Sequence, residues 1–217
     1  MEQINLIYLD RRILVTIKPS GILSTDEPGG MPELLRNAMG EPEACIRTVH
    51  RLDRVTSGLM VFARSRAADR ILSEQVQNHE FQKKYLAVVH GIPPAEGIFQ
   101  DLLLRDRTTR RTHVETEPAQ GVQKAELSYR TLETVTGASL VEIALRTGRT
   151  HQIRVQFSAR GFPLVGDRKY GDAADDCPLA LWSCHLGFFH PEGGNWMEFS
   201  AAPPDIYPWN LFQLPKE

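Results

Sequence analysis

Residues 50–63 read HRLDRVTSGLMVFA, and they join a charged loop directly to an apolar segment that we predict to be a buried strand over Gly58–Ala63. In the loop a single carboxylate, Asp53, lies between Arg51 and Arg54. Neighbouring cations favour the ionised form of a carboxylate, so this residue type suits a nucleophile or a base even where it is partly buried. The same pattern is equally typical of an aspartate that caps a turn or pairs with arginine in a solvated loop.

The segments on both sides of this stretch alternate between strand and helix patterns without the regular order of a parallel strand–helix–strand fold. Pro32 suits the first turn of a short helix that ends near Ala38, and Ser65 is placed to cap a helix that continues to about His79. Further strands are predicted at 4–9, 13–17, 84–89, 126–132, 139–145 and within 179–199, and a further helix at 151–159. We therefore predict an α+β fold with a mixed, largely antiparallel sheet flanked by helices and loops.

Length and composition predict one large domain over residues 1–217, because 41% of the residues are hydrophobic and no repeat or linker divides the chain. A net charge of -2 excludes a protein that coats nucleic acid through bulk positive charge, so any polyanion must bind at a local basic patch. Three cysteines without a C-x-x-C pair favour a reducing compartment, and we expect a cytoplasmic protein. The N-terminal residues contain no apolar run long enough for a signal peptide or a membrane span.

The usual signatures of nucleotide hydrolysis, hydride transfer, zinc proteolysis and the α/β-hydrolase reaction are all missing from the sequence. The nearest approach to a metal cluster has a spacing that matches no familiar zinc pattern, and it consists of Cys177, Cys184, His185 and His190. We therefore predict no metal site, and we interpret these residues as buried cysteines and edge-strand histidines.

Three further segments concentrate basic and aromatic residues. Residues 146–154 (RTGRTHQIR) place Arg154 on a predicted helix where it could reach a carboxylate or a phosphate, although a basic helix face in solvent has the same pattern. Residues 105–113 carry four arginines against one aspartate, which is the local footprint that a phosphate backbone requires but also a common solvated loop. Tyr85 follows two lysines at a strand start, where it could stack on a base or simply pack.

Taken together and in this order, these segments resemble the RluA-type family of pseudouridine synthases. The resemblance runs from about Ile4 to about Pro203 and rests on KPSG (18–21), HRLD with TSG (50–58), Lys84-Tyr85 with Val88 and Gly91, TGRTHQIR (147–154), and PLVGD with Tyr170-Gly171 (163–171). It implies a pseudouridine synthase fold with a central cleft, and the isomerisation of selected uridines in RNA without a cofactor. It also implies a ribosomal or transfer RNA stem-loop as partner. We expect no DNA and no membrane as partners, and we take a monomer as the default.

The resemblance assigns roles to individual residues. Asp53 becomes the essential catalytic group, Tyr85 stacks on the target uracil, and Arg154 pairs with the Asp53 carboxylate. Ile153 lines the floor of the pocket, and Arg51 fills the gap that the extruded base leaves. The further candidates for substrate contact are Lys18, His50, Arg149 and His151, and those for the RNA backbone are Arg105, Arg107, Arg110 and Arg111.

The sequence departs from the family pattern at Gln156, where a histidine usually follows the HQIR motif. Because HRLD begins at position 50, we expect no additional RNA-binding module of the kind that many relatives carry before the catalytic domain. Two other functions stay open at this stage. One is an RNA-binding module that has lost its activity, and the other is a nucleosidase that acts on a small nucleoside.

Overall fold

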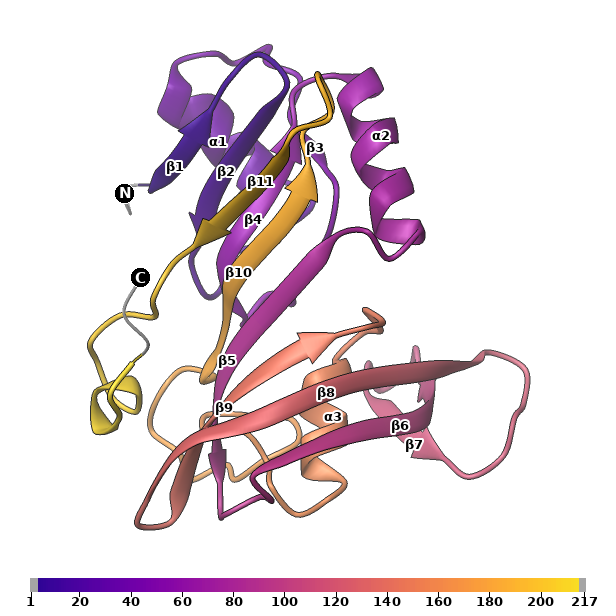
Figure 1. Cartoon of the computed structure of the whole chain (residues 1–217), viewed down its shortest axis with the longest axis vertical. Coiled ribbons are helices and arrows are strands. Elements are labelled where there is room, and N and C mark those ends of the chain that lie inside the picture. The colour runs from indigo at the N-terminus through magenta and orange to yellow at the C-terminus, as the bar shows by residue number, and fades with distance from the viewer. Residues whose placement is uncertain (1–3, 215–217) are drawn as a thin grey trace. The chain divides into compact units, whose positions relative to one another are not determined.

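The computed structural model describes residues 4–214, which divide into two compact units. The first unit contains residues 4–83 and 182–201, and the second contains residues 84–181 and 202–214. The chain passes from the first unit to the second along one strand and returns along another, as the colours of Figure 1 allow the reader to follow. That both units serve one catalytic domain, as the sequence leads us to expect, stays a prediction.

The first unit is built on a mixed sheet in which the strand order is β1-β2-β4-β10-β11, with the short β3 also paired to β4. All of these pairs are antiparallel except β4 with β10, which run parallel. The strands are β1 (Leu6–Leu9), β2 (Ile13–Lys18), β3 (Arg47–Thr48), β4 (Ser57–Ala63), β10 (Leu181–Phe189) and β11 (Trp196–Ser200). The predicted strands at 13–17 and 58–63 are therefore confirmed to within one residue at each end.

Two helices complete the first unit, and each begins where the sequence predicts. In α1 (Met31–Met39) Pro32 occupies the first turn, and in α2 (Arg66–Gln77) the Ser65 hydroxyl accepts a hydrogen bond of 3.1 Å from the Ala68 amide. Helix α2 lies along one face of the sheet (Figure 1), where its apolar side packs into a buried cluster with β2, β4 and β10. That cluster contains Ile13, Val15, Leu59, Val61, Ala63, Ala68, Leu72, Phe81, Leu186 and Phe188.

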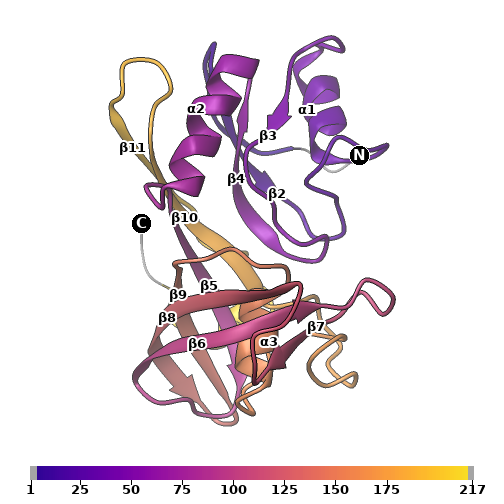
Figure 2. The same cartoon turned by 90° about the vertical axis from the view of Figure 1, so that its right-hand side faces the viewer.

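The second unit is an antiparallel sheet with the strand order β5-β9-β8-β6-β7, shown in Figure 2. Its elements are β5 (Gln82–His90), β6 (Glu96–Arg105), β7 (Thr112–Glu115), β8 (Val122–Val135), β9 (Ala138–Leu145), α3 (Gln152–Ser158) and a short 3-10 helix (Trp209–Leu211). Helix α3 packs against β6 and β7. Phe157 of α3 meets the rings of Phe99 and Tyr129 edge-on, with ring centroids 5.0 and 5.3 Å away.

The α+β prediction is confirmed, but the sequence analysis missed three strands. Strands β3 and β6 were not predicted, and β7 lies partly in the segment interpreted as a loop. Apolar residues occupy both faces of β6, because Phe99 and Leu103 are buried whereas Ile98 is exposed. The strand therefore lacks the alternation of apolar and polar residues that predicts a half-buried strand. Within residues 4–214 every helix is too short or too polar to serve as a membrane-spanning segment.

Candidate active site

The loop that carries Asp53 connects β3 to β4 and is fixed at its far end by backbone contacts. The Thr56 amide donates a hydrogen bond of 3.0 Å to the Asp53 carbonyl oxygen, which turns the chain into β4. Gly58 has φ of 114°, and a Cβ atom there would lie 2.4 Å from the backbone oxygen of Ser183. Only glycine fits this approach of the two strands, which explains the glycine of the TSG motif.

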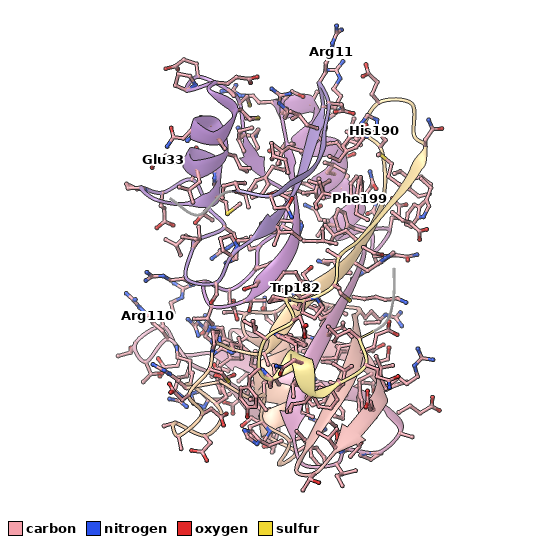
Figure 3. The ribbon with its side chains drawn as sticks, turned by 90° about the vertical axis from the view of Figure 1, so that its left-hand side faces the viewer. Arg11, Glu33, Arg110, Trp182, His190 and Phe199 are labelled. Carbon is pink, nitrogen blue, oxygen red and sulfur yellow. The ribbon has the colours of Figure 1, made fainter. Side chains whose placement is uncertain are left out.

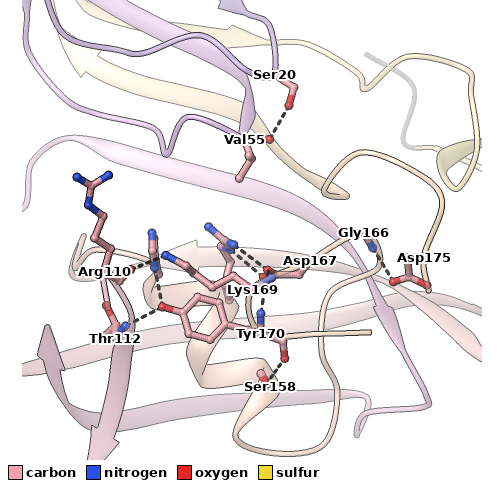
Figure 4. Close-up of polar contacts among 12 residues, drawn as sticks. Ser20, Val55, Arg110, Thr112, Ser158, Gly166, Asp167, Lys169, Tyr170 and Asp175 are labelled. Carbon is pink, nitrogen blue, oxygen red and sulfur yellow. Dashed lines mark hydrogen bonds and ion pairs between the residues drawn. The ribbon is translucent and has the colours of Figure 1, made fainter. Parts of the chain in front are cut away.

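A second loop, which follows β2, is bonded to the Asp53 loop along its length. The Ser24 hydroxyl donates a 2.8 Å bond to the Leu52 carbonyl and accepts one of 3.1 Å from the Leu52 amide. The remaining bonds pair Gly21 with Arg54 and Ser20 with Val55, the latter drawn in Figure 4. The two loops therefore form one bonded structure, and the position of Asp53 depends on both.

Lys18 is the first residue of the KPSG motif, and its side chain is fully buried beneath these loops. Its Nζ donates hydrogen bonds to the carbonyl oxygens of Pro19, Ile22 and Arg54, at 2.8, 2.8 and 3.1 Å. Burial lowers the pKa of Lys18 from 10.5 to about 8, against the opposing influence of the Asp53 charge. The predicted contact between Lys18 and substrate does not fit this geometry, because the buried ammonium group already donates its hydrogen bonds to backbone oxygens. Lys18 instead braces the Asp53 loop.

His50 is also buried, with 6% of its surface exposed. Its Nε2 accepts a hydrogen bond of 3.2 Å from the Val61 amide, and its ring centroid lies 5.4 Å from that of Phe81. Burial, with a smaller contribution from the Lys83 charge, lowers the pKa of His50 to about 3, so the ring is neutral at pH 7. The prediction that His50 contacts substrate is therefore replaced by a role in the core, whereas Arg51 beside it is exposed.

Lys83 is a cation that the sequence analysis did not single out. Its ammonium lies 5.7 Å from the centroid of the Phe81 ring, and burial lowers its pKa. Across the part of the chain that the structure describes, no carboxylate forms an ion pair with it. A partly buried cation without a counter-charge suits an anionic ligand, because desolvated charges in proteins are normally paired. The only sequence signal was its position in the lysine pair before Tyr85.

In the second unit, Gln152 shapes the turn that starts α3. Its Oε1 accepts hydrogen bonds from the Thr147 hydroxyl at 2.8 Å and the Arg149 amide at 3.0 Å, and its Nε2 donates to the Glu126 carbonyl at 3.1 Å. His151 then adopts a left-handed backbone with φ of 57°, and the helix begins at Gln152. This buried glutamine bonds the turn to β8.

Arg154 forms a buried bidentate ion pair with Asp167. Its Nε lies 2.8 Å from Oδ2 and its Nη2 lies 2.7 Å from Oδ1 of Asp167, which is 1% exposed. Burial acts to raise the pKa of Asp167, but the Arg154 bond and charge and the backbone amides of Lys169 and Tyr170 lower it below the usual value. The pair uses two of the three guanidinium nitrogens. That Arg154 also pairs with Asp53 stays a prediction. The sequence analysis assigned no role to Asp167.

Tyr85 and Ile153 lie on two different elements of the second unit. Tyr85 is on β5, opposite Ile143 of β9, and only 5% of its surface is exposed. Ile153 lies in the first turn of α3 and is buried. Their predicted roles, stacking on the uracil and lining the pocket floor, stay predictions.

The arginine loop, residues 105–111, connects β6 to β7. The carboxylate of Asp106, its one acidic residue, accepts hydrogen bonds from Thr108 and Thr109, and these bonds lower its pKa. Arg105 is partly buried and donates from Nη1 to the Arg110 carbonyl. Three arginines are exposed and form no ion pair with any described carboxylate: Arg107, Arg110 and Arg111. Figure 3 shows Arg110 extending away from the chain.

Arg149 and Gln156 are held by contacts inside the second unit. The exposed side chain of Arg149 donates from Nε to the Lys124 carbonyl at 3.0 Å. Gln156 is fully buried and donates a bond of 2.6 Å to Asp101, which also forms an ion pair with Arg160. The departure from the family histidine therefore leaves α3 bonded to β6.

The cysteine and histidine set that first suggested a metal does not form a cluster. His190 pairs with Asp10 at 2.9 Å, and none of the three cysteines forms a disulfide. Among residues 4–214, no three histidine, cysteine or acidic side chains lie close enough together to hold a metal ion.

Comparison with known proteins adds an independent line of evidence. Residues 12–159 match the family described as RNA pseudouridylate synthase. An uncharacterized RNA pseudouridine synthase of Chloroflexus aurantiacus is 38% identical over 198 residues, covering 86% of this chain but only 62% of that protein. The dual-specificity RNA pseudouridine synthase RluA of Vibrio vulnificus is 36% identical over 217 residues, covering 94% of this chain and 84% of that protein. The solved human RNA Pseudouridylate Synthase Domain Containing 1 has a similar fold, with a TM-score of 0.80 and 25% identity over 100% of this chain and 91% of that one.

Proposed function

The chain belongs to the RNA pseudouridylate synthase family, and we propose that it isomerises specific uridines in structured RNA to pseudouridine without a cofactor. The reaction breaks the bond between N1 of uracil and C1′ of ribose, turns the base, and forms a bond between C5 and C1′. The hydrogen of C5 leaves to solvent as a proton and N1 gains a proton, so reactant and product have the same composition. The target must leave the base stack and occupy a closed pocket, which costs a few kcal/mol.

Asp53 is the catalytic residue of this proposal. The observation that carries it is the construction around this one carboxylate: two loops bonded to each other, with the buried ammonium of Lys18 joining them. Such bracing fixes the carboxylate, as a group that acts on a sugar or a base requires. Glycoside hydrolysis usually needs a pair of carboxyl groups. The family match and the single braced carboxylate together favour isomerisation over net hydrolysis.

The other roles follow the family resemblance. Tyr85 stacks on the target uracil, Ile153 lines the floor of the pocket, and Arg51 takes the place of the extruded base. Arg154 pairs with Asp53 and keeps its carboxylate ionised. The bidentate contact with Asp167 supports this role, because it holds the guanidinium in one orientation.

RNA binding rests on a small number of basic side chains. The exposed arginines of the arginine loop and the ammonium of Lys83 contact backbone phosphates, together with Arg149 and His151 at the α3 turn. The substrate is a stem-loop of ribosomal or transfer RNA, since an unpaired loop base is the cheapest to extrude. We place the reaction in the cytoplasm, in keeping with three cysteines that form no disulfide.

The test is tritium release from RNA labelled at C5 of uridine, measured separately on ribosomal and on transfer RNA. The wild type should release tritium from one pool, and Asp53→Asn should release none while it still binds RNA. Asp69→Asn is the matched control, because it removes a carboxylate that forms an ion pair with Arg47 at the surface of the same unit. Normal release by Asp53→Asn would refute the catalytic assignment.

The same assay separates the two other functions. A nucleosidase would cleave free uridine to uracil and ribose at a rate indifferent to salt, whereas binding to an RNA backbone weakens steeply as salt rises. An inactive RNA-binding module would bind RNA with the same salt dependence in the wild type and in Asp53→Asn, and neither would release tritium.

A further inference from the structure

Tyr170 lies at the centre of a polar cluster in the second unit, and the proposed function gives it no role. Figure 4 shows its hydroxyl beside Thr112, at the start of β7, and its backbone beside Asp167. The Tyr170 amide donates to Oδ1 of Asp167 at 3.1 Å, and its carbonyl accepts the Ser158 hydroxyl at 2.6 Å. The residue is therefore fixed to α3 and to the carboxylate that holds Arg154.

The phenol oxygen of Tyr170 joins this cluster to the arginine loop. It accepts a hydrogen bond of 2.7 Å from the Thr112 amide, directly after the loop, and lies 2.6 Å from Nδ1 of His151. Arg105 also approaches Nδ1 at 3.4 Å, and a guanidinium can only donate. Nδ1 therefore accepts, and the phenol donates to it. Thr112 is 3% exposed, so its amide has no water to replace the phenol oxygen.

The ring of Tyr170 contacts two guanidinium groups with different tasks. The Cζ of Arg154 lies 5.2 Å from the ring centroid, and the Cζ of Arg111 lies 5.3 Å from it. Both distances suit a cation–π contact. Lys169 adds a bond of 2.5 Å from Nζ to the Arg110 carbonyl, which holds the loop from the side of the Asp167 segment.

We infer that Tyr170 is a positioning residue that couples the arginine loop to Arg154, so that one side chain sets both the RNA-binding arginines and the guanidinium of the catalytic site. The inference rests on the proposed function, because it takes RNA as the ligand of the loop. The two contacts are separable: the hydroxyl holds the loop through Thr112, and the ring packs against Arg154 and Arg111.

The test separates the hydroxyl from the ring with two variants of the full chain. Tyr170→Phe removes the phenol oxygen and keeps the ring, which leaves the buried Thr112 amide unpaired. Its Kd for the RNA substrate should rise about tenfold, which corresponds to about 1.4 kcal/mol, while kcat at saturating RNA stays within about twofold. Tyr170→Leu also removes the ring, and both Kd and kcat should worsen.

Two readouts would not respond to a general loss of stability. If the loop arginines leave their phosphates, the slope of log Kd against log salt should become shallower by about 1 to 2 in Tyr170→Phe. Hydrogen exchange should accelerate at the amides of residues 106–112 but not in α2, which belongs to the first unit. Tyr129→Phe is the matched control, because it removes a phenol oxygen that forms no hydrogen bond with any described residue of the chain. It should match the wild type in all measurements.

Each outcome has a defined meaning. An unchanged Kd and salt slope in Tyr170→Phe would overturn the coupling, and so would a fall in kcat at an unchanged Kd. Lower stability with an unchanged slope would also overturn it. If the wild type itself releases no tritium from any RNA, the proposed function fails, whereas the RNA affinity and hydrogen exchange of Tyr170→Phe still decide the coupling.

Discussion

Replacing Lys18 by methionine should separate the bracing of the Asp53 loop from the chemistry of Asp53 itself. The side chain keeps its length and apolar volume but loses the ammonium that donates to three carbonyl oxygens. Hydrogen bonds from a charged donor contribute roughly 1.5–3 kcal/mol each. Against this, the shift of the Lys18 pKa from 10.5 to about 8 means that burying the charge costs about 3 kcal/mol. We expect Lys18→Met to lower the free energy of unfolding by about 2–5 kcal/mol at pH 7.

The pH dependence tests the same reasoning. Since the folded-state pKa is lower than the unfolded value, the unfolded chain binds the proton between about pH 8 and 10.5, and wild-type stability rises with pH across this window. Lys18→Met lacks this contribution. The difference in unfolding free energy between the two proteins should therefore grow by about 2–3 kcal/mol from pH 7 to pH 10. Urea unfolding followed by tryptophan fluorescence measures this difference in unfolding free energy. All other titrating groups are common to both proteins, so their contributions cancel in the difference.

Activity supplies the second measurement. The loops keep the Ser24–Leu52 and Gly21–Arg54 bonds, so we expect the kcat of tritium release to fall about 10- to 100-fold rather than to vanish. Arg11→Met is the control, since it removes an exposed cation from the same unit (Figure 3). A Lys18→Met protein with wild-type kcat, or a stability difference that does not change between pH 7 and pH 10, would refute the bracing argument.

Three further substitutions test other parts of the structure. Asp167→Asn leaves Arg154 buried without its counter-charge and should lower the unfolding free energy by about 3–5 kcal/mol in urea. Because the pKa of Asp167 is lowered, this difference should persist above about pH 4 and shrink as the pH falls through the folded-state pKa. Gly58→Ala should prevent stable folding, judged by thermal melting, whereas Gly137→Ala, with φ of 82° and open space around it, should cost only about 1–2 kcal/mol. Lys83→Met should weaken RNA affinity and make the salt slope shallower by about 0.7–0.9, measured by RNA titration at several salt concentrations; an unchanged slope would remove Lys83 from the RNA-binding residues.

The sequence predicted those helices and strands whose caps and apolar pattern agree with their burial in the fold. Helix α2 has a capping serine and an apolar face, and β4 is a continuous apolar run, so both were found within one or two residues. Strands β6 and β7 were missed because the long antiparallel sheet of the second unit mixes buried and exposed apolar residues along each strand. Propensity and periodicity describe a single strand, whereas the pairing of β6 with both β7 and β8 decides which residues are covered.

The candidate site shows a different limit of sequence reasoning. Lys18, His50, Gln152 and Asp167 are polar residues in the recognised motifs, and polarity there suggested contact with substrate or carried no assignment at all. The structure buries all four, and each of them bonds to backbone groups. Lys18 and Gln152 bond to the loop of Asp53 and to the turn before Arg154, respectively. His50 bonds to β4, and Asp167 bonds to the amide of Tyr170 and to Arg154 itself. A buried polar group that bonds to several backbone atoms fixes a loop as apolar packing cannot, because each unmade bond would leave a desolvated carbonyl or amide.

This distinction has a consequence for mutagenesis at motif positions. Loss of activity at Lys18 or Asp167 does not by itself identify a group that touches RNA, since these residues act through the backbone or through another side chain. Residues that contact substrate should change the affinity, the salt slope or the chemistry while the unfolding free energy stays near that of the wild type. Asp53, Arg51 and the exposed arginines of the arginine loop meet the structural condition for such behaviour, because none of them is fully buried. Measuring stability beside activity for every variant is therefore what assigns a motif residue to the scaffold or to the reaction.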